Sequence, residues 1–327
     1  MSIPKLVAAN IVTGFLGSGK TTLLKSALKE GLDGLKVALI VNEFGDIDID
    51  GVVLQHGINV DRMVQLPSGC VCCTIGSRFA LAVQEIVDSV QPHMIIIETS
   101  GVAEPGPLVS ELSLIGVRTD SVITVVDAEN IARFCKENES AVRQIEEADF
   151  VVINKTDLVS SKELVRVKRL LNKLNDRALL VTSYYGQVAE DILFTSSVVR
   201  HLRRSAQKIE HDGHEKHLEG GGITAFSFQR EGVLSRDRFE QVLEKLPAQV
   251  YRAKGIVKFS GEGWSSVFNY TCGRWRVEWL APVAGTAFNN RAVVIGKDLA
   301  KVQERILQKL EGTLVEEQLA VAVARNG

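Results

Sequence analysis

The first 200 residues alternate between short, continuously apolar runs and stretches with helical periodicity. Two of those stretches, Arg78–Val90 and Lys162–Leu174, place apolar residues at i, i+3 and i+4, as amphipathic helices do. Apolar runs without polar alternation are typical of strands buried on both faces of a parallel sheet. We therefore expect an α/β fold with a largely parallel sheet flanked by helices. The runs that predict its strands are Leu6–Thr13, Lys36–Asn42, Met94–Glu98, Val122–Asp127, Val151–Asn154 and Ala178–Thr182.

A polar segment, residues 201–222, follows this region and ends in the run Glu219-Gly220-Gly221-Gly222. Such a composition predicts a linker, which leaves residues 1–200 as the N-terminal domain. His211, His214 and His217 recur at every third position and can share a face that binds metal. Their charged neighbours favour a solvated linker instead.

Residues 223–327 have the pattern of a second, smaller α+β domain. Two helices are predicted, Asp237–Leu246 and Asp298–Leu310, and Ser235 stands where the first needs an N-cap. The strand-like runs around them are Ile223–Phe228, Val250–Phe259, Ser266–Tyr270, Arg274–Trp279 and Ala292–Ile295.

Charge and cysteine content narrow the classes of function. Lys plus Arg number 38 and Asp plus Glu 40, a net charge of −2 that favours neither nucleic acid nor an anionic membrane as a partner. The longest apolar runs are about five residues, far short of the ~20 that a membrane span needs. No signal peptide is recognised at the N-terminus. Three of the five cysteines fall within four residues, which predicts reduced cytoplasmic thiols rather than a disulfide framework.

The first motif is the run Gly14-Phe15-Leu16-Gly17-Ser18-Gly19-Lys20-Thr21, which matches G-x-x-x-x-G-K-[ST]. It follows a predicted strand and opens a predicted helix, the context of a P-loop. Its glycines let backbone N–H groups surround phosphate oxygens, and the helix adds its positive N-terminal end. We expect Lys20 to neutralise the β- and γ-phosphates and Thr21 to place its hydroxyl on Mg²⁺.

A second motif, Asn154-Lys155-Thr156-Asp157, ends a predicted strand and reads N-K-x-D. The Asp157 carboxylate can accept hydrogen bonds from two guanine donors, a pair that adenine does not offer. Asn154 would support the loop, the Lys155 stem would stack on the base, and the backbone of Thr182-Ser183 would add a contact. The alternative is that Asp157 caps a helix.

The third motif, Glu98-Thr99-Ser100-Gly101, follows a buried strand. The Glu98 carboxylate suits a water-mediated contact to Mg²⁺. The Gly101 N–H suits the γ-phosphate, because a side chain there would obstruct its approach. The alternative is a strand-end acid that caps the next helix.

The run Gly69-Cys70-Val71-Cys72-Cys73 places thiols at i, i+2 and i+3. Three thiolates can converge on Zn²⁺, with Co²⁺, Ni²⁺ and Cu(I) as competitors, and they leave one ligand position open for metal that is handed on. Buried or redox-active cysteines are the alternative. Cys135 and Cys272 are isolated, and we interpret both as structural.

An acidic stretch, Asn42–Asp50, falls where a GTPase switch loop belongs. Glu43 is a candidate fourth ligand for the metal. Asp46, Asp48 or Asp50 can contact Mg²⁺ or orient water, and a solvated acidic loop is the alternative.

Together these motifs resemble the CobW family of P-loop GTPases, in family order. The matching segments are Gly14–Thr21, Asn42–Gly45, Gly69–Cys73, Glu98–Gly101, Val125–Ala128 and Asn154–Asp157, and residues around Val293–Leu310 resemble the end of the CobW C-terminal domain.

The resemblance implies a metallochaperone that hydrolyses GTP, with zinc or cobalt as its cargo. It implies that Cys70, Cys72 and Cys73 are metal ligands, that Gly17–Thr22 bind phosphates, and that Asn154 and Asp157 bind guanine. We also expect Glu43 or Asp50 to position the attacking water. The recipient would be a client metalloenzyme or a protein of metal-cofactor biosynthesis, and a homodimer dependent on nucleotide or metal is a further expectation.

Two other functions stay open on the sequence. One is a metal-buffering or metal-sensing protein in which GTP only labels the state. The other is a signalling GTPase with a structural cysteine cluster.

Overall fold

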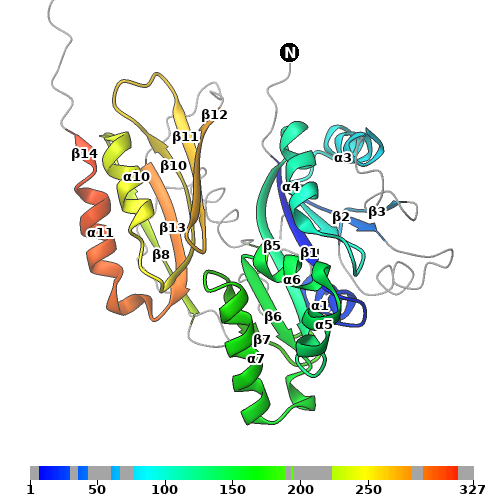
Figure 1. The fold of residues 1–327 in the computed structure, drawn as a ribbon. Coiled ribbons are helices and arrows are strands. Elements are labelled where there is room, and N and C mark those ends of the chain that lie inside the picture. The colour runs from blue at the N-terminus through cyan, green and yellow to red at the C-terminus, as the bar shows by residue number, and fades with distance from the viewer. Residues whose placement is uncertain are drawn as a thin grey trace, which may run out of the picture. The chain divides into compact units, whose positions relative to one another are not determined.

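The computed structural model describes residues 7–29, 36–42, 60–66, 77–188, 193–194, 223–280 and 290–315. The chain divides into two compact units, residues 1–196 and residues 197–327 (Figure 1). The first contains a seven-stranded sheet and the second a five-stranded sheet.

The sheet of the first unit has the strand order β3-β2-β4-β1-β5-β6-β7, and every pairing in it is parallel. This confirms the expected parallel α/β fold. In β4, Ile95, Ile96 and Ile97 are all buried, so both faces of this central strand are covered. The strands are β1 (Ala8–Thr13), β2 (Val37–Asn42), β3 (Arg62–Leu66), β4 (Met94–Glu98), β5 (Arg118–Asp127), β6 (Phe150–Asn154) and β7 (Leu179–Thr182).

Two features of this sheet differ from the sequence prediction. The edge strand β3 was not predicted, because its sequence, R-M-V-Q-L, has no continuous apolar run. Strand β5 begins at Arg118, four residues before the predicted Val122. Its first residues are polar, and Arg118 and Asp120 form an ion pair at 3.6 Å in which both side chains are buried.

The helices of the first unit pack on the sheet through two apolar clusters. Phe79 of α3 and Leu108 of α4 join Ile95 and Ile97 in one of them. Residues of α5, α6 and α7 join β5 and β6 in the other. The helices are α1 (Lys20–Leu28), α3 (Ser77–Val90), α4 (Pro105–Leu114), α5 (Ile131–Glu137), α6 (Glu139–Glu146), α7 (Ser161–Leu174) and the 3₁₀ helix η1 (Thr156–Leu158).

The local sequence around Ser160 determines where helix α7 begins. Ser160 is its N-cap: the Ser160 hydroxyl accepts from Glu163 N at 3.3 Å, and the Glu163 carboxylate accepts from Ser160 N at 2.9 Å. This is a capping box, and it starts the helix one residue before the predicted Lys162. Helices α4, α5 and α6 were not predicted, because α4 opens with Pro-Gly-Pro and the other two span only 7 and 8 residues.

The second unit is an antiparallel sheet in the order β12-β11-β10-β13-β8, with α10 (Arg236–Glu244) and α11 (Gln303–Glu311). Phe239 of α10 and Ile306 of α11 lie in one core cluster with Phe268 of β11. The remaining elements are β8 (Ile223–Arg230), β9 (Val233–Leu234), β10 (Val250–Lys258), β11 (Ser265–Thr271), β12 (Arg274–Leu280), β13 (Asn290–Lys297), η2 (Leu299–Lys301) and β14 (Leu314–Val315).

The predicted helices of this unit need two corrections. The segment 298–310 is not one helix, because Asp298 takes a left-handed φ of 54° and a 3₁₀ turn precedes α11. Ser235 does occupy the N-cap of α10, but its side chain makes no capping hydrogen bond to any described residue.

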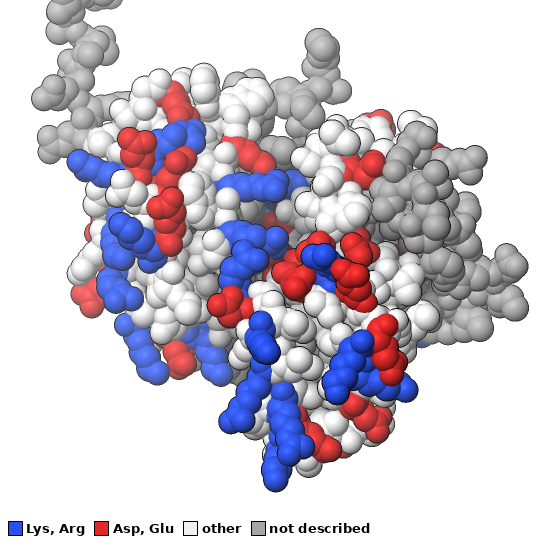
Figure 2. All heavy atoms as spheres, in the orientation of Figure 1, with Lys and Arg blue, Asp and Glu red and all other residues white. Residues whose placement is uncertain are grey.

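Lysine and arginine side chains gather over α7 (Figure 2). Lys162, Arg166, Arg169 and Lys173 are exposed at spacings of three or four residues, which puts them on one side of the helix. Val167 and Leu171 are buried on the other side.

Over the part of the chain that the structure describes, no helix is long and apolar enough to cross a membrane.

Candidate functional site

The loop of residues 14–19 connects β1 to α1, and three of its glycines have left-handed φ angles. These are 138° at Gly14, 73° at Gly17 and 99° at Gly19. A Cβ atom would lie 2.1 Å from Val125 O at Gly14 and 2.3 Å from Asn154 Nδ2 at Gly19. Both conformation and space therefore require glycine at these two positions.

Two polar side chains of the loop are buried. The Lys20 ammonium donates to Gly14 O at 2.8 Å and to Phe15 O at 3.4 Å, which bends the side chain back over the loop. The Ser18 hydroxyl is fully buried and has no hydrogen-bond partner among the described residues. Helix α1 has neither a side-chain cap nor an acidic residue in its first turn. The helix therefore brings no carboxylate of its own to this positive end, and the loop fits a phosphate group.

Thr21 of α1 and Glu98 at the end of β4 meet beside the loop. The Thr21 hydroxyl donates to Glu98 Oε1 at 3.2 Å, and Glu98 is buried. Parallel strands end at one edge of the sheet, which is why residues so distant in sequence converge here. A hydroxyl and a carboxylate are hard oxygen ligands of the kind that Mg²⁺ prefers, so these two residues fit that ion.

Gly101 lies against the phosphate loop. A Cβ atom on Gly101 would lie 2.6 Å from Leu16 Cγ and 2.7 Å from Leu16 N. The turn is closed by a hydrogen bond from Ala103 N to Ser100 O at 3.1 Å. Any side chain at 101 would push this turn away from the loop.

Asn154 joins three segments at the carboxyl end of the sheet. Its amide donates to Ser18 O of the phosphate loop at 3.0 Å, and its carbonyl accepts from Gly186 N at 3.2 Å. Thr156 adds a bond from its hydroxyl to Ser183 O at 2.9 Å. The N-K-x-D turn is thus attached both to the phosphate loop and to the loop after β7.

Asp157 is exposed in η1, and its side chain makes no hydrogen bond to a described residue. The N-cap of α7 is Ser160, so the reading of Asp157 as the cap of that helix is wrong. Lys155, beside it, has a left-handed φ of 58°.

Asp127, at the end of β5, holds Lys155. Its carboxylate accepts from Lys155 Nζ at 2.8 Å, from Asn130 Nδ2 at 3.1 Å and from Glu129 N at 2.9 Å. Burial works to raise the pKa of Asp127, but these hydrogen bonds outweigh it, and the pKa lies below its usual value. The sequence analysis assigned no role to Asp127, although Val125–Ala128 resembles the family; an acid at the end of a buried strand was the available signal.

The predicted metal ligands Cys70, Cys72, Cys73 and Glu43 lie outside the described residues, as do Asp46, Asp48, Asp50 and the linker histidines. In the described ranges, no group of three or more His, Cys, Asp or Glu side chains is placed to hold a metal ion. Cys135 and Cys272 are half-buried and form no disulfide with a described residue, and burial raises the pKa of Cys135.

Comparisons with known proteins match both units. Residues 8–182 match the family model "CobW/HypB/UreG, nucleotide-binding domain", and residues 223–314 match "Cobalamin synthesis protein cobW C-terminal domain".

Two relatives and one solved structure illustrate the likeness. "Zinc chaperone CobW" of Sinorhizobium sp is 32% identical over 295 residues, which cover 78% of this chain and 82% of the relative. "Zinc-regulated GTPase metalloprotein activator 1" of Schizosaccharomyces pombe is 30% identical over 303 residues, which cover 79% of this chain and 74% of the relative. The crystal structure of Zn(II)-bound YjiA GTPase from E. coli is 21% identical, with a TM-score of 0.45, and the match covers 95% of this chain and 100% of that one.

Proposed function

The chain belongs to the CobW/HypB/UreG family of P-loop GTPases, and from that premise we propose that it is a metal chaperone. It would bind a thiophilic cation through Cys70, Cys72 and Cys73, and release that cation to a client protein as GTP is hydrolysed. Relatives named as zinc chaperones and zinc-regulated GTPases support zinc as the cargo. Cobalt remains a second candidate cargo, and Glu43 a candidate fourth ligand.

The proposal that the chain binds a nucleotide rests on two hydrogen bonds of Asn154. They join the phosphate loop, the N-K-x-D turn and the loop after β7 at one edge of the sheet. A nucleotide whose phosphates lie on residues 14–22 would then place its base near Asp157. The Asp157 side chain, with no described partner, is available to accept from guanine.

The described residues have distinct roles in this proposal. Lys20 exchanges its bonds to loop carbonyls for bonds to the β- and γ-phosphate oxygens, and the Ser18 hydroxyl gains a phosphate partner. Thr21 and Glu98 hold Mg²⁺, which when bound supplies positive charge to those oxygens. Gly101 offers its N–H to the γ-phosphate. Glu43 or Asp50 positions the attacking water.

We also propose the wider arrangement of the molecule. Residues 1–200 form the GTPase domain, 201–222 a linker and 223–327 the C-terminal domain, which the two compact units and the two family matches support. The proposed recipient is a client metalloenzyme or a metal-cofactor biosynthesis protein, and the proposed active form is a nucleotide- or metal-dependent homodimer. The cytoplasm is the proposed compartment, because thiolate ligands must stay reduced.

The test uses Co²⁺ as a probe, because thiolate ligation gives charge-transfer absorption that nitrogen and oxygen ligands do not. We expect the full chain to show this absorption, and replacement of Cys70, Cys72 and Cys73 by Ser to abolish it. Cys135→Ser is the matched control and should keep it. Unchanged absorption in the triple variant would contradict the metal site.

Release distinguishes a chaperone from a metal buffer. With Co²⁺ bound, we expect transfer to a chelator to be faster during GTP hydrolysis than with GTPγS or GDP. Equal rates under all three conditions would contradict the coupling and favour a metal-buffering protein.

A further inference from the structure

Helix α6 holds the loop that follows β4. The Gln144 side chain is fully buried, and its amide donates to Gly101 O at 3.2 Å and to Ala103 O at 2.9 Å. One side chain therefore binds two carbonyls of the turn that contains Gly101. The backbone of Gln144 is itself fixed to the sheet, because its carbonyl accepts from the Thr124 hydroxyl at 2.6 Å.

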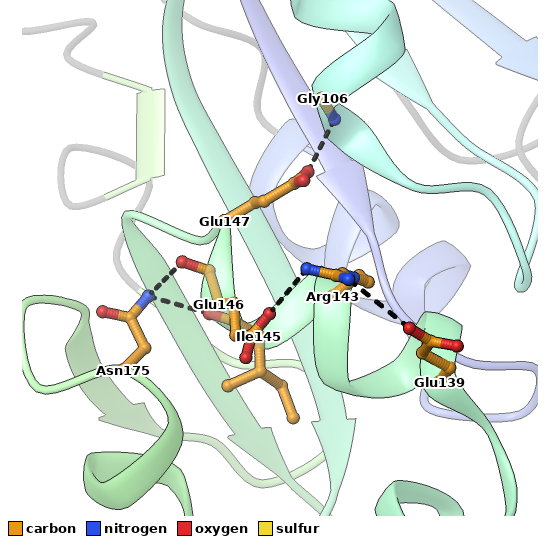
Figure 3. Close-up of polar contacts among 7 residues, drawn as sticks. All are labelled: Gly106, Glu139, Arg143, Ile145, Glu146, Glu147 and Asn175. Carbon is orange, nitrogen blue, oxygen red and sulfur yellow. Dashed lines mark hydrogen bonds and ion pairs between the residues drawn. The ribbon is translucent and has the colours of Figure 1, made fainter.

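A second residue on the same face of α6 binds the start of α4. Glu147, the C-cap of α6, accepts from Gly106 N at 2.6 Å (Figure 3). Pro105 and Pro107 have no N–H, so Gly106 supplies one of the few donors at the start of α4. Residues three apart lie on the same side of a helix, which is why Gln144 reaches the Gly101 turn and Glu147 reaches the start of α4 that follows it.

The loop is thus in contact with the phosphate loop and with Gln144, and its Ala103 carbonyl also accepts from the Thr13 hydroxyl at 3.3 Å. Gly101 lies against Leu16 of the phosphate loop, and its carbonyl is bound by Gln144. Loss of the two Gln144 bonds would leave the turn free to move relative to Leu16. The position of the Gly101 N–H at the phosphate loop therefore depends on Gln144.

We propose that Gln144 is a positioning residue that holds the Gly101 N–H where a γ-phosphate needs it, so that Gln144 sets the preference for GTP over GDP. The inference rests on the proposed guanine-nucleotide site, but it is independent of metal binding. GDP lacks the γ-phosphate and makes no use of Gly101, so its affinity should not depend on Gln144.

Gln144→Leu removes both donors and keeps a similar volume. We expect the affinity for GTPγS to fall at least ~10-fold and the affinity for GDP to change less than ~2-fold, as measured by displacement of a fluorescent GDP analogue. If Gln144→Leu does not fold, Gln144→Met, which keeps the unbranched shape without the donors, takes its place.

Asn175, the C-cap of α7, offers a matched control because it binds the end of α6. Its amide donates to Ile145 O at 2.8 Å and Glu146 O at 3.1 Å at the C-terminal end of α6 (Figure 3). It also donates to Ala148 O at 2.9 Å. Asn175→Ala should loosen α6 without touching the Gly101 turn. We expect it to lower the melting temperature and leave the ratio of GTPγS to GDP affinity unchanged.

The two variants separate positioning from general stability. Equal losses for GTPγS and GDP in Gln144→Leu, or the same change of ratio in Asn175→Ala, would overturn the inference. A parent chain that binds both nucleotides but no Co²⁺ would contradict the chaperone proposal. The role of Gln144 could still be tested by the ratio of GTPγS to GDP affinity. A parent that binds neither nucleotide would overturn both.

Discussion

At the residue scale, the proposed selection of guanine rests on Asp157. An ionised carboxylate accepts from two guanine donors, whereas an amide at the same position brings a donor of its own. We expect Asp157→Asn to lower the affinity for GTP on the order of 10²-fold and to raise that for xanthosine triphosphate. Competition binding of the two nucleotides measures the change. An unchanged preference for GTP in a folded variant would contradict the assignment.

Residues within motifs could be predicted from sequence because each motif fixes both residue type and spacing. Lys20, Thr21, Glu98 and Asn154 are of this kind, and the structure brings them together at one edge of the sheet. Gln144 could not be found this way, since a single glutamine in a short helix has no spacing to recognise. Its position becomes meaningful only when the fold places α6 beside the Gly101 turn.

At the element scale, burial decides which strands and helices the sequence reveals. Strand β4 has three consecutive isoleucines, and such a run reads as a strand buried on both faces. The edge strand β3 lacks such a run, because an edge strand needs less apolar cover. The helix predicted over 298–310 was wrong at its start, because the left-handed turn at Asp298 leaves no trace in hydrophobic periodicity.

The capping box of α7 gives a prediction at this scale. Ser160→Ala removes the acceptor for Glu163 N, and we expect the free energy of unfolding to fall by about 1 kcal/mol. Ser161→Ala, at the first position of the helix, is the matched control and should cost less. Urea denaturation of both variants measures the difference.

The same capping box predicts that the stability cost of Ser160→Ala depends on pH. Hydrogen bonds from the Ser160 hydroxyl and backbone N–H lower the pKa of Glu163 below its usual value. A lowered pKa means that the bonds stabilise fully above that value and are lost as the pH falls through the folded-state pKa. The cost of Ser160→Ala should therefore shrink in acid; a cost that stays constant below pH ~4 would contradict the box.

At the scale of the whole molecule, the proposed nucleotide site and the cysteine motif occupy different segments of the sequence. Lys20 contacts the phosphate loop, while Cys70, Cys72 and Cys73 lie about 50 residues further along the chain. Coupling between them must pass through the segments that respond to the γ-phosphate. Metal binding without nucleotide should therefore not require Lys20.

We expect Lys20→Ala to reduce GTP hydrolysis at least ~10²-fold, because its charge would no longer stabilise the γ-phosphate. The affinity for Co²⁺ without nucleotide should stay within about 2-fold of the parent, while the difference in Co²⁺ affinity between the GTPγS and GDP states should disappear. Lys25→Ala, in the last turn of the same helix, is the control and should preserve both properties. If Lys20→Ala loses Co²⁺ without any nucleotide, the two sites are not separate, and nucleotide and metal must share ligands.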